Sequence, residues 1–464
     1  MTSKINNKDR GCTEVYKEQY RPQFHFTPKK NWLNDPNGMV FYNGEYHLFF
    51  QYHPFDTQWG PMHWGHATSS DLIHWEEQAC ALYPDEHGTI FSGSAVVDRD
   101  DTTGFFIGGH GLVAIYTQHK EQNDVVEQVQ SLAYSNDNGR TWIKYKNNPV
   151  LANKKHPDFR DPKVFWHEKS KRWIMVISCG QVIHFYSSTN LIEWIFLSEF
   201  GEGYGEHYAV WECPDLFELP IEGTKETKWV LIVSIGDNEN VVEGSRTQYF
   251  IGDFDGKTFT SDYPKERVLW LDRGRDNYAG VSWSDIPVTD GRRIYIAWMS
   301  NWKYAGHTPT GNWRGAMTLP RTMSLVNTAQ GIRIKQQVVE EMGGIIDNIV
   351  NFINSETVFI SLKIEDDFAL ALRTREEPEL SISYANNKVT VERLGMFQAK
   401  DEIDLDTMVN MKIYLDTSSV ELFINDGLEA FTYQIFPKGK ITDINLQSTD
   451  KNYVLEIHEI KSIW

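Results

Sequence analysis

Short hydrophobic runs rich in aromatic and β-branched residues recur along the first two thirds of the chain, and turn-forming residues bound each of them. Such runs are typical of β-strands, and the i, i+3, i+4 spacing of an amphipathic helix is almost absent. The clearest of them predict inner or central strands of sheets, at residues 46–52, 112–117, 173–178, 229–235 and 294–299. The pattern therefore predicts an all-β protein.

A second pattern lies between these runs, where a turn rich in Ser or Asp is followed by an aromatic residue. It covers residues 69–75, 135–142 and 187–194, and a weaker copy covers residues 253–259. The intervals are longer than a typical solenoid repeat but suit four-stranded propeller blades with loop insertions.

The pattern changes after residue 325. Residues 336–342 predict a short helix that Gly343 and Gly344 would end. Short alternating strands then resume at residues 358–364, 368–372, 380–384, 389–394, 411–415, 420–424 and 453–457. Seven short strands with regular turns favour a β-sandwich, and Asn425-Asp426-Gly427 predicts a hairpin turn within it.

Composition narrows the possible functions. A chain of 464 residues can form two or three domains, and its formal net charge of -19 argues against nucleic acid or an anionic membrane as a partner. The 4 cysteines form no disulfide framework, and His63 and His66 have no matching acidic ligand. We therefore expect no metal and no cofactor. Residues 1–20 contain no apolar run typical of a secretory signal, so we expect a cytoplasmic protein.

Three acidic residues stand in distinctive surroundings: Asp35 in residues 32–38 (WLNDPNG), Asp161 in residues 159–162 (FRDP) and Glu212 in residues 211–215 (WECPD). Cleavage of a glycosidic bond needs one carboxylate and one carboxylic acid, and a third anion can tune both. We expect the turn amides around Asp35 and the charge of Arg160 to favour ionisation of their neighbours.

Further motifs follow in a fixed order between residues 23 and 325: FQY at 50–52, WGPMHWGH at 59–66, FSGS at 91–94 and MSNW at 299–302. With these motifs the chain resembles family 32 of the glycoside hydrolases, the invertases, levanases and inulinases that act on β-fructofuranosides. The resemblance implies that Asp35 is the nucleophile, Glu212 the general acid/base and Asp161 a transition-state stabiliser. It also implies a five-bladed β-propeller, which the five strong strand runs fit.

We accordingly expect an all-β chain with a five-bladed β-propeller followed by a C-terminal β-sandwich. The expected parts are an N-terminal extension (1–22), a catalytic propeller domain (23–330), a linker with a short helix (331–350) and the sandwich (351–464). The sandwich carries none of the three acidic motifs, so we favour a structural role or a homo-oligomer contact for it over the alternative of direct sugar binding.

The other motif residues suit a small, neutral, hydroxyl-rich ring, because they offer uncharged hydrogen bonds and flat apolar walls. We expect the substrate to contact Asn34, Gln51, Trp59, Phe91, Ser92, Arg160 and Trp302. Cys213 follows the expected acid directly, and we expect it to pack beside Glu212 without acting as a nucleophile.

The expected activity is a retaining, exo-acting hydrolase that releases fructose from sucrose, inulin-type or levan-type fructans through a covalent fructosyl-enzyme. The segment from 299 to 314 resembles exo-acting levanases and inulinases more than sucrose-6-phosphate hydrolases. Alternatives that remain open are a fructosyltransferase with the same catalytic residues, a non-catalytic sugar-binding propeller, and an inverting propeller enzyme that acts on arabinans.

Overall fold

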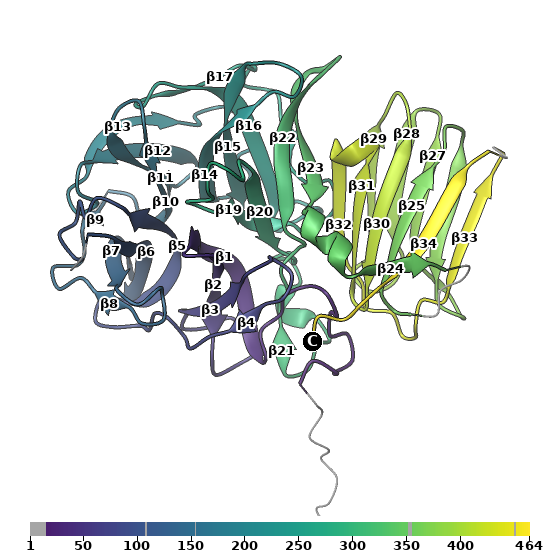
Figure 1. Ribbon diagram of the computed structural model, residues 1–464, viewed down its shortest axis with the longest axis horizontal. Coiled ribbons are helices and arrows are strands. Elements are labelled where there is room, and N and C mark those ends of the chain that lie inside the picture. Colours follow the sequence, from purple (N-terminus) through teal and green to yellow (C-terminus); the bar gives the residue numbers. More distant parts are fainter. Residues whose placement is uncertain (1–14, 107–108, 154, 351–354, 450–451) are drawn as a thin grey trace, which may run out of the picture.

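The structure is a computed structural model that describes residues 15–106, 109–153, 155–350, 355–449 and 452–464. Nearly all its regular elements are strands, which form five sheets on one side of the molecule and two on the other (Figure 1). In this described part of the chain, no helix has the length and apolar character needed to cross a bilayer. The expected all-β class is confirmed.

Each of the first five sheets is a blade of mainly antiparallel strands. The first blade contains β1 (Asn31–Tyr42), β2 (Glu45–His53), β3 (His63–Ser69), β4 (Glu76–Glu77) and β21 (Trp313–Arg314). The second contains β5 (Thr89–Asp98), β6 (Gly111–Gln122), β7 (Val125–Ser135), β8 (Ile143–Lys144) and β9 (Leu151–Ala152). The third contains β10 (Phe159–His167), β11 (Arg172–Cys179), β12 (Val182–Ser188) and β13 (Ile195–Phe200).

The last two blades follow the same order. The fourth contains β14 (Trp211–Pro220), β15 (Thr227–Ile235), β16 (Arg246–Phe254), β17 (Phe259–Ser261) and β18 (Leu269–Trp270). The fifth contains β19 (Tyr278–Ser282), β20 (Arg293–Trp298), β22 (Arg321–Thr328) and β23 (Gly331–Val338), and the 3-10 helix η1 (Ala305–His307) lies between β20 and β21.

The innermost strands of the blades form a closed ring. Each of β1, β5, β10, β14 and β19 contacts the innermost strands of both neighbouring blades, and β1 contacts β19. The short strand β21 also pairs with the start of β1 in parallel, which ties the chain between β20 and β22 to the first blade. The expected five-bladed propeller followed by a sandwich is confirmed.

The strong hydrophobic runs of the sequence are the second strands of the blades, β2, β6, β11, β15 and β20. Most of their residues are buried on both faces, which explains their continuous hydrophobic character. The turn-and-aromatic pattern follows the third strands of four blades. In these turns, the side-chain oxygens of Asp71, Asp137, Asn190 and Asp255 accept hydrogen bonds from main-chain amides.

Every innermost strand contains a β-bulge near its first residue. The register against the second strand shifts at residues 33–36, 90–93, 160–163, 212–215 and 278–281. A bulge leaves two residues opposite one and re-aims their side chains. All three acidic motifs lie at such bulges. The bulges therefore turn acidic side chains from three different blades toward one end of the ring.

The sandwich consists of two facing sheets with an aliphatic core between them. One sheet contains β24 (Ile346–Ile349), β34 (Val454–Ile460), β25 (Val358–Lys363), β30 (Asn410–Asp416), β31 (Ser419–Ile424) and β32 (Glu429–Gln434). The other contains β29 (Ala399–Asp404), β28 (Lys388–Arg393), β27 (Pro378–Ala385), β26 (Phe368–Arg373) and β33 (Asp443–Ser448).

The predicted hairpin turn joins β31 to β32 as the short 3-10 element η3 (Asn425–Gly427). Gly427 has a φ of +90°, and a Cβ atom there would lie 1.6 Å from the main-chain oxygen of Gln336 in the propeller. Only glycine fits this position, because the turn of the sandwich packs directly against strand β23.

The predicted helix at 336–342 is wrong. Residues up to Val338 belong to β23, where Gln336 pairs with Met323, and a 3-10 helix, η2 (Glu340–Gly344), follows. Pairing with β22 and burial of the Gln336 side chain outweigh the local helical tendency. Residues 331–338 are therefore the outer strand of the fifth blade, which differs from the expected linker.

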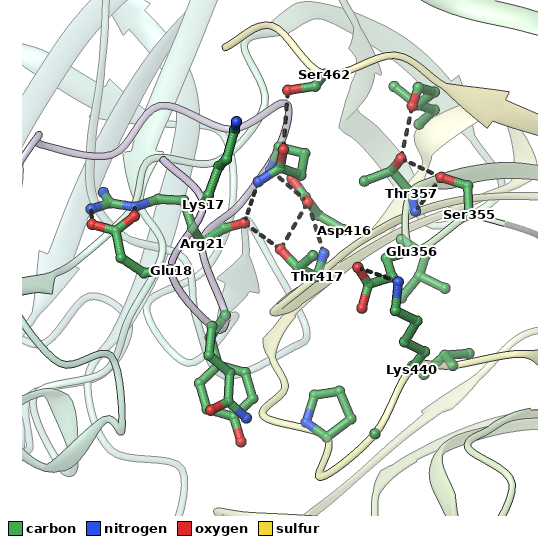
Figure 2. Close-up of a pocket in the computed structure, with 18 of the residues that line it drawn as sticks. Lys17, Glu18, Arg21, Ser355, Glu356, Thr357, Asp416, Thr417, Lys440 and Ser462 are labelled. Carbon is green, nitrogen blue, oxygen red and sulfur yellow. Dashed lines mark hydrogen bonds and ion pairs between the residues drawn. The ribbon is translucent and has the colours of Figure 1, made fainter. Parts of the chain in front are cut away.

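The N-terminal segment packs along the edge of the sandwich (Figure 2). Thr417 donates a hydrogen bond to the main-chain oxygen of Arg21 over 2.6 Å, and the amide of Gln23 donates to Asp416 over 2.8 Å. Tyr16 stacks on Trp464 with ring centroids 3.9 Å apart. Of the expected extension, residues 15–22 are described, and they help to line a cavity of about 800 Å³ against the sandwich.

Buried charges join the propeller to the sandwich. The side chain of Glu421 in β31 accepts hydrogen bonds from both Arg321 in β22 and His25, and the second ring nitrogen of His25 lies 2.8 Å from Asp416. These side chains are fully buried or nearly so. The oppositely charged partners must therefore offset the free-energy cost of burying each charge.

We expect His25 to make stability depend on pH between about 6.5 and 9. Burial opposes the charge of His25, but hydrogen bonds and the charges of Asp416 and Glu421 raise its pKa to about 9. The unfolded histidine has a pKa near 6.5, so this stabilisation is complete below pH 6.5 and is lost as the pH rises through about 9. The difference amounts to about 3 kcal/mol.

Thermal unfolding of the parent and of His25→Asn from pH 6 to 10 checks this. The gap in Tm between the two proteins should shrink over that range, whereas His74→Asn, at an exposed histidine, should follow the parent throughout. A gap that stays constant with pH would contradict the expectation.

Candidate active site

The structure brings the three acidic residues of the sequence motifs together. Asp35 lies in β1, Asp161 in β10 and Glu212 in β14. The main-chain amide of Cys213 donates to Oδ2 of Asp161 over 3.0 Å, and the Cys213 thiol lies 3.5 Å from Oδ2 of Asp35. Arg160 donates to Oε1 of Glu212 over 3.0 Å, and its Nε lies 4.0 Å from Oδ2 of Asp161.

Asp35 is held by three donors at the bulge of β1. Asn34 donates to Oδ1 over 2.9 Å, whereas Ser92 and the Cys213 thiol lie at Oδ2, Ser92 at 2.7 Å. Burial and the nearby charge of Glu212 nevertheless raise the pKa of Asp35 to about 6. Local donors do favour its ionisation, but they are the side chains of Asn34, Ser92 and Cys213 in place of the expected turn amides, and burial outweighs them.

Asp161 has a φ of +66° in the bulge of β10, and its own amide donates to the hydroxyl of Thr117 over 2.9 Å. Its side chain is only 6% exposed. Burial raises the pKa of Asp161 to about 7; the charge of Arg160 opposes this shift, and the charges of Glu212 and Asp35 add to it. The adjacent guanidinium thus offsets only part of the cost of placing this carboxylate among two others.

Glu212 keeps 22% of its side chain exposed and is held on both oxygens. Arg160 binds Oε1, and the hydroxyl of Tyr278 in β19 donates a hydrogen bond to Oε2. Burial and the charge of Glu212 hold the pKa of Tyr278 well above its usual value, so the phenol keeps its proton and donates. Arg160 is held in turn by Asp158, to which it donates over 2.7 Å.

The expected substrate contacts surround these acids to different degrees. Asn34 and Ser92 touch Asp35 directly, as described above, and Arg160 touches Glu212. Gln51 is buried in β2 and donates to Asn37 over 2.8 Å, so its side chain supports the turn after Asp35.

Three aromatic side chains offer surfaces near the acids. Trp59 is 48% exposed and meets the edge of Phe91, which precedes Ser92. Trp302 is partly buried and packs against Trp298 with ring centroids 4.8 Å apart.

Sequence reasoning missed Tyr278 and Thr117, and found Cys213 without its role as a donor. Tyr278 begins the short strand β19, whose five residues gave no distinct strand signal. Thr117 ends a run that was recognised only as a hydrophobic strand. Cys213 could have been found, because a residue inside a motif and next to an acid is a natural hydrogen-bond donor. Burial raises the pKa of its thiol well above the usual value, so it stays protonated.

A ring of bulged strands that gathers two aspartates, a glutamate and an arginine, with neutral donors and aromatic walls beside them, is the arrangement of a glycosidase. Comparison with known proteins gives the same class. The sequence model of the glycosyl hydrolases family 32 N-terminal domain matches residues 25–337, and that of the family 32 C-terminal domain matches residues 335–462. The chain belongs to family 32 of the glycosyl hydrolases.

Individual relatives agree along nearly the whole chain. A levanase of Bacillus subtilis is 46% identical over 98% of this chain and 72% of its own length. An extracellular exo-inulinase of Aspergillus niger is 36% identical over 97% of this chain and 96% of its own. The crystal structure of exo-inulinase from Aspergillus awamori has a TM-score of 0.88 at 36% identity, over 97% of this chain and 100% of that one.

Proposed function

We propose that the protein is a retaining, exo-acting hydrolase that releases fructose from β-fructofuranosides such as sucrose, inulin and levan. The convergence of Asp35, Asp161 and Glu212 from the bulges of three innermost strands carries this proposal. The levanase and exo-inulinase relatives support fructans as substrates, and a fructofuranosidase structure of Schwanniomyces occidentalis complexed with fructosylnystose is similar at 31% identity.

In the first step, a carboxylate oxygen of Asp35 attacks the anomeric carbon of the terminal fructosyl unit. The bond from that carbon to the leaving oxygen breaks, and Glu212 gives its proton to this oxygen. Oδ2 of Asp35 is held by two donors and Oδ1 by one, so Oδ1 has more lone-pair density free for the attack. The product is a covalent fructosyl-enzyme and a free alcohol.

In the second step, the carboxylate of Glu212 takes a proton from water as the water oxygen attacks the anomeric carbon. The ester bond to Asp35 breaks, and fructose leaves with its original anomeric configuration. Tyr278 and Arg160 hold the two oxygens of Glu212 in place for both proton transfers. Asp161 accepts hydrogen bonds from fructose hydroxyls and stabilises the positive charge that develops on the ring.

The remaining expectations stay predictions. They are association through the sandwich, a cytoplasmic location, and the contacts of substrate with Asn34, Gln51, Trp59, Phe91, Ser92, Arg160 and Trp302. A fructosyltransferase would use the same first step, so the fate of the fructosyl-enzyme separates the two activities.

Product analysis on sucrose, inulin and levan tests the proposal. We expect fructose as the first and dominant product from the ends of all three substrates, because water needs no separate acceptor site. Dominant oligosaccharides at high sucrose would instead indicate transfer, early release of long fragments from levan would indicate endo cleavage, and no turnover of any of the three would refute the proposal.

A further inference from the structure

A buried ring of hydrogen bonds connects the sandwich to the propeller behind the active site. Arg393, the last residue of β28, donates to Oδ2 of Asp276 over 2.8 Å and to the hydroxyl of Tyr304 over 2.9 Å. Tyr304 donates to Oδ1 of the same carboxylate over 2.7 Å, and the amide of Gln434 in β32 donates to Oδ2 over 2.8 Å. The side chains of Arg393 and Asp276 are 2% and 0% exposed.

One branch of this ring leads to Glu212. Asp276 precedes Tyr278 by two residues, and Tyr278 donates to Oε2 of Glu212. Between them, the side chain of Asn277 accepts a hydrogen bond from Tyr295 over 2.8 Å. The segment that leads into β19 is thus fixed at consecutive residues, and Asp276 is one of the points where the sandwich holds it, beside Arg273 and Arg275, whose amides donate to main-chain oxygens of β32.

The other branch leads to Asp35. Tyr304 follows Trp302 by two residues, and the ring of Trp302 stacks against Trp32 with centroids 6.1 Å apart. Trp32 donates from its indole nitrogen to Asn34 over 2.7 Å, and Asn34 donates to Asp35 over 2.9 Å. The Tyr304 ring also stacks on Phe397 of the sandwich at 4.2 Å, so both its ring and its hydroxyl are fixed from that side.

We propose that Arg393 is a positioning residue through which the sandwich orients both catalytic carboxylates, Glu212 by way of Asp276 and Asp35 by way of Tyr304. This rests on the roles given to Asp35 and Glu212 in the proposed function. Without Arg393, Asp276 keeps a buried charge that lacks its cation, and the segments around residues 276–278 and 302–304 rearrange to solvate it. Arg393 does not touch the substrate, so its replacement lowers activity only because the catalytic carboxylates are displaced.

Another buried pair across the same interface provides a matched control. Arg333 in β23 donates to Glu429 in β32 over 2.8 Å, with both side chains 7 to 8% exposed. This pair joins the propeller to the sandwich but lies on the outer strand of the fifth blade. Arg333→Met should therefore lower the Tm without changing the geometry of the acids.

The experiment compares Arg393→Met, Arg393→Lys and Arg333→Met, using sucrose and an aryl β-fructofuranoside as substrates. For Arg393→Met we expect kcat on sucrose to fall about 10- to 100-fold with KM nearly unchanged, because a 1 Å misplacement can cost that much. The loss should be several-fold smaller on the aryl fructoside, whose leaving group needs little help from Glu212. Arg393→Lys keeps the charge and should recover part of kcat. Arg333→Met should keep kcat within about twofold.

Tyr304→Phe removes one hydroxyl and keeps the stacked ring. This variant tests the proposal if Arg393→Met does not fold. We expect a several-fold loss of kcat that is similar on the two substrates, because the Tyr304 branch leads to Asp35, which both substrates need. Unchanged kcat in the folded Arg393 or Tyr304 variants, an equal loss on both substrates in Arg393→Met, or the same loss in Arg333→Met would overturn the inference. A parent enzyme that releases no fructose would instead refute the proposed function itself.

Discussion

Replacing Asp35 with asparagine is expected to lower kcat by about four to six orders of magnitude, the scale seen when a nucleophile is removed. Asparagine has nearly the same shape: its one oxygen can accept from Asn34, and its NH2 group can donate to the Ser92 hydroxyl in place of the lost oxygen. Its amide cannot form the ester with the anomeric carbon, so no fructosyl-enzyme accumulates. The measurement is fructose release from sucrose at pH 7, above the pKa of about 6, where the parent Asp35 is ionised.

The same substitution is expected to raise the Tm. The pKa of Asp35 is higher in the folded protein than its usual 3.8, so the folded state binds the proton more tightly and loses stability as the pH rises from about 4 through about 6. Removing the charge at pH 7 should recover up to about 2 kcal/mol, allowing for partial exposure of the side chain. Such an exchange of stability for activity is common at active sites.

Asp285→Asn is the matched control. Asp285 is another partly buried aspartate, hydrogen-bonded by the amide of Val97 and by Arg99, and it follows the end of β19. The Asp285→Asn variant should keep kcat within about twofold of the parent. Fructose release at the parent rate by Asp35→Asn would end the assignment of Asp35 as nucleophile.

The sequence predicted the second strands of the blades better than the innermost ones, for a physical reason. The second strands are buried on both faces and read as continuous hydrophobic runs. The innermost strands carry the polar side chains of the site and a bulge each, which breaks the alternation that marks a strand. In the sandwich, β29 was missed because its alternate residues are charged and exposed.

The candidate site was predictable only where its residues lie in local motifs. Asp35, Asp161 and Glu212 each lie in a recognisable sequence motif, so the sequence predicted them. Tyr278 and Arg393 lie in no such motif, and their partners are 66 and 117 residues away. Closure of the ring and docking of the sandwich bring these partners together. The sequence also did not predict that the pKa values of Asp35 and Asp161 are raised, because burial causes these shifts.

Replacing Glu212 with glutamine is expected to lower kcat on sucrose by about 10²- to 10⁴-fold, the usual contribution of general acid/base catalysis. The oxygen of glutamine can still accept from Arg160, and its NH2 group can donate to the hydroxyl of Tyr278, so the site should keep its shape. The sugar alkoxide leaves poorly without a proton, whereas an aryl leaving group does not need one. Formation of the fructosyl-enzyme from an aryl β-fructofuranoside should therefore be nearly preserved in this variant.

Added azide then distinguishes loss of the acid/base from general damage. Azide needs no base to attack the fructosyl-enzyme, so it should accelerate turnover of the aryl fructoside by Glu212→Gln and yield fructosyl azide with retained configuration. Glu218→Gln, at an exposed glutamate in the same strand β14, should behave like the parent. An equal loss on both substrates with no azide product would show that Glu212 is not the proton donor, and an azide product of inverted configuration would exclude the covalent intermediate on Asp35.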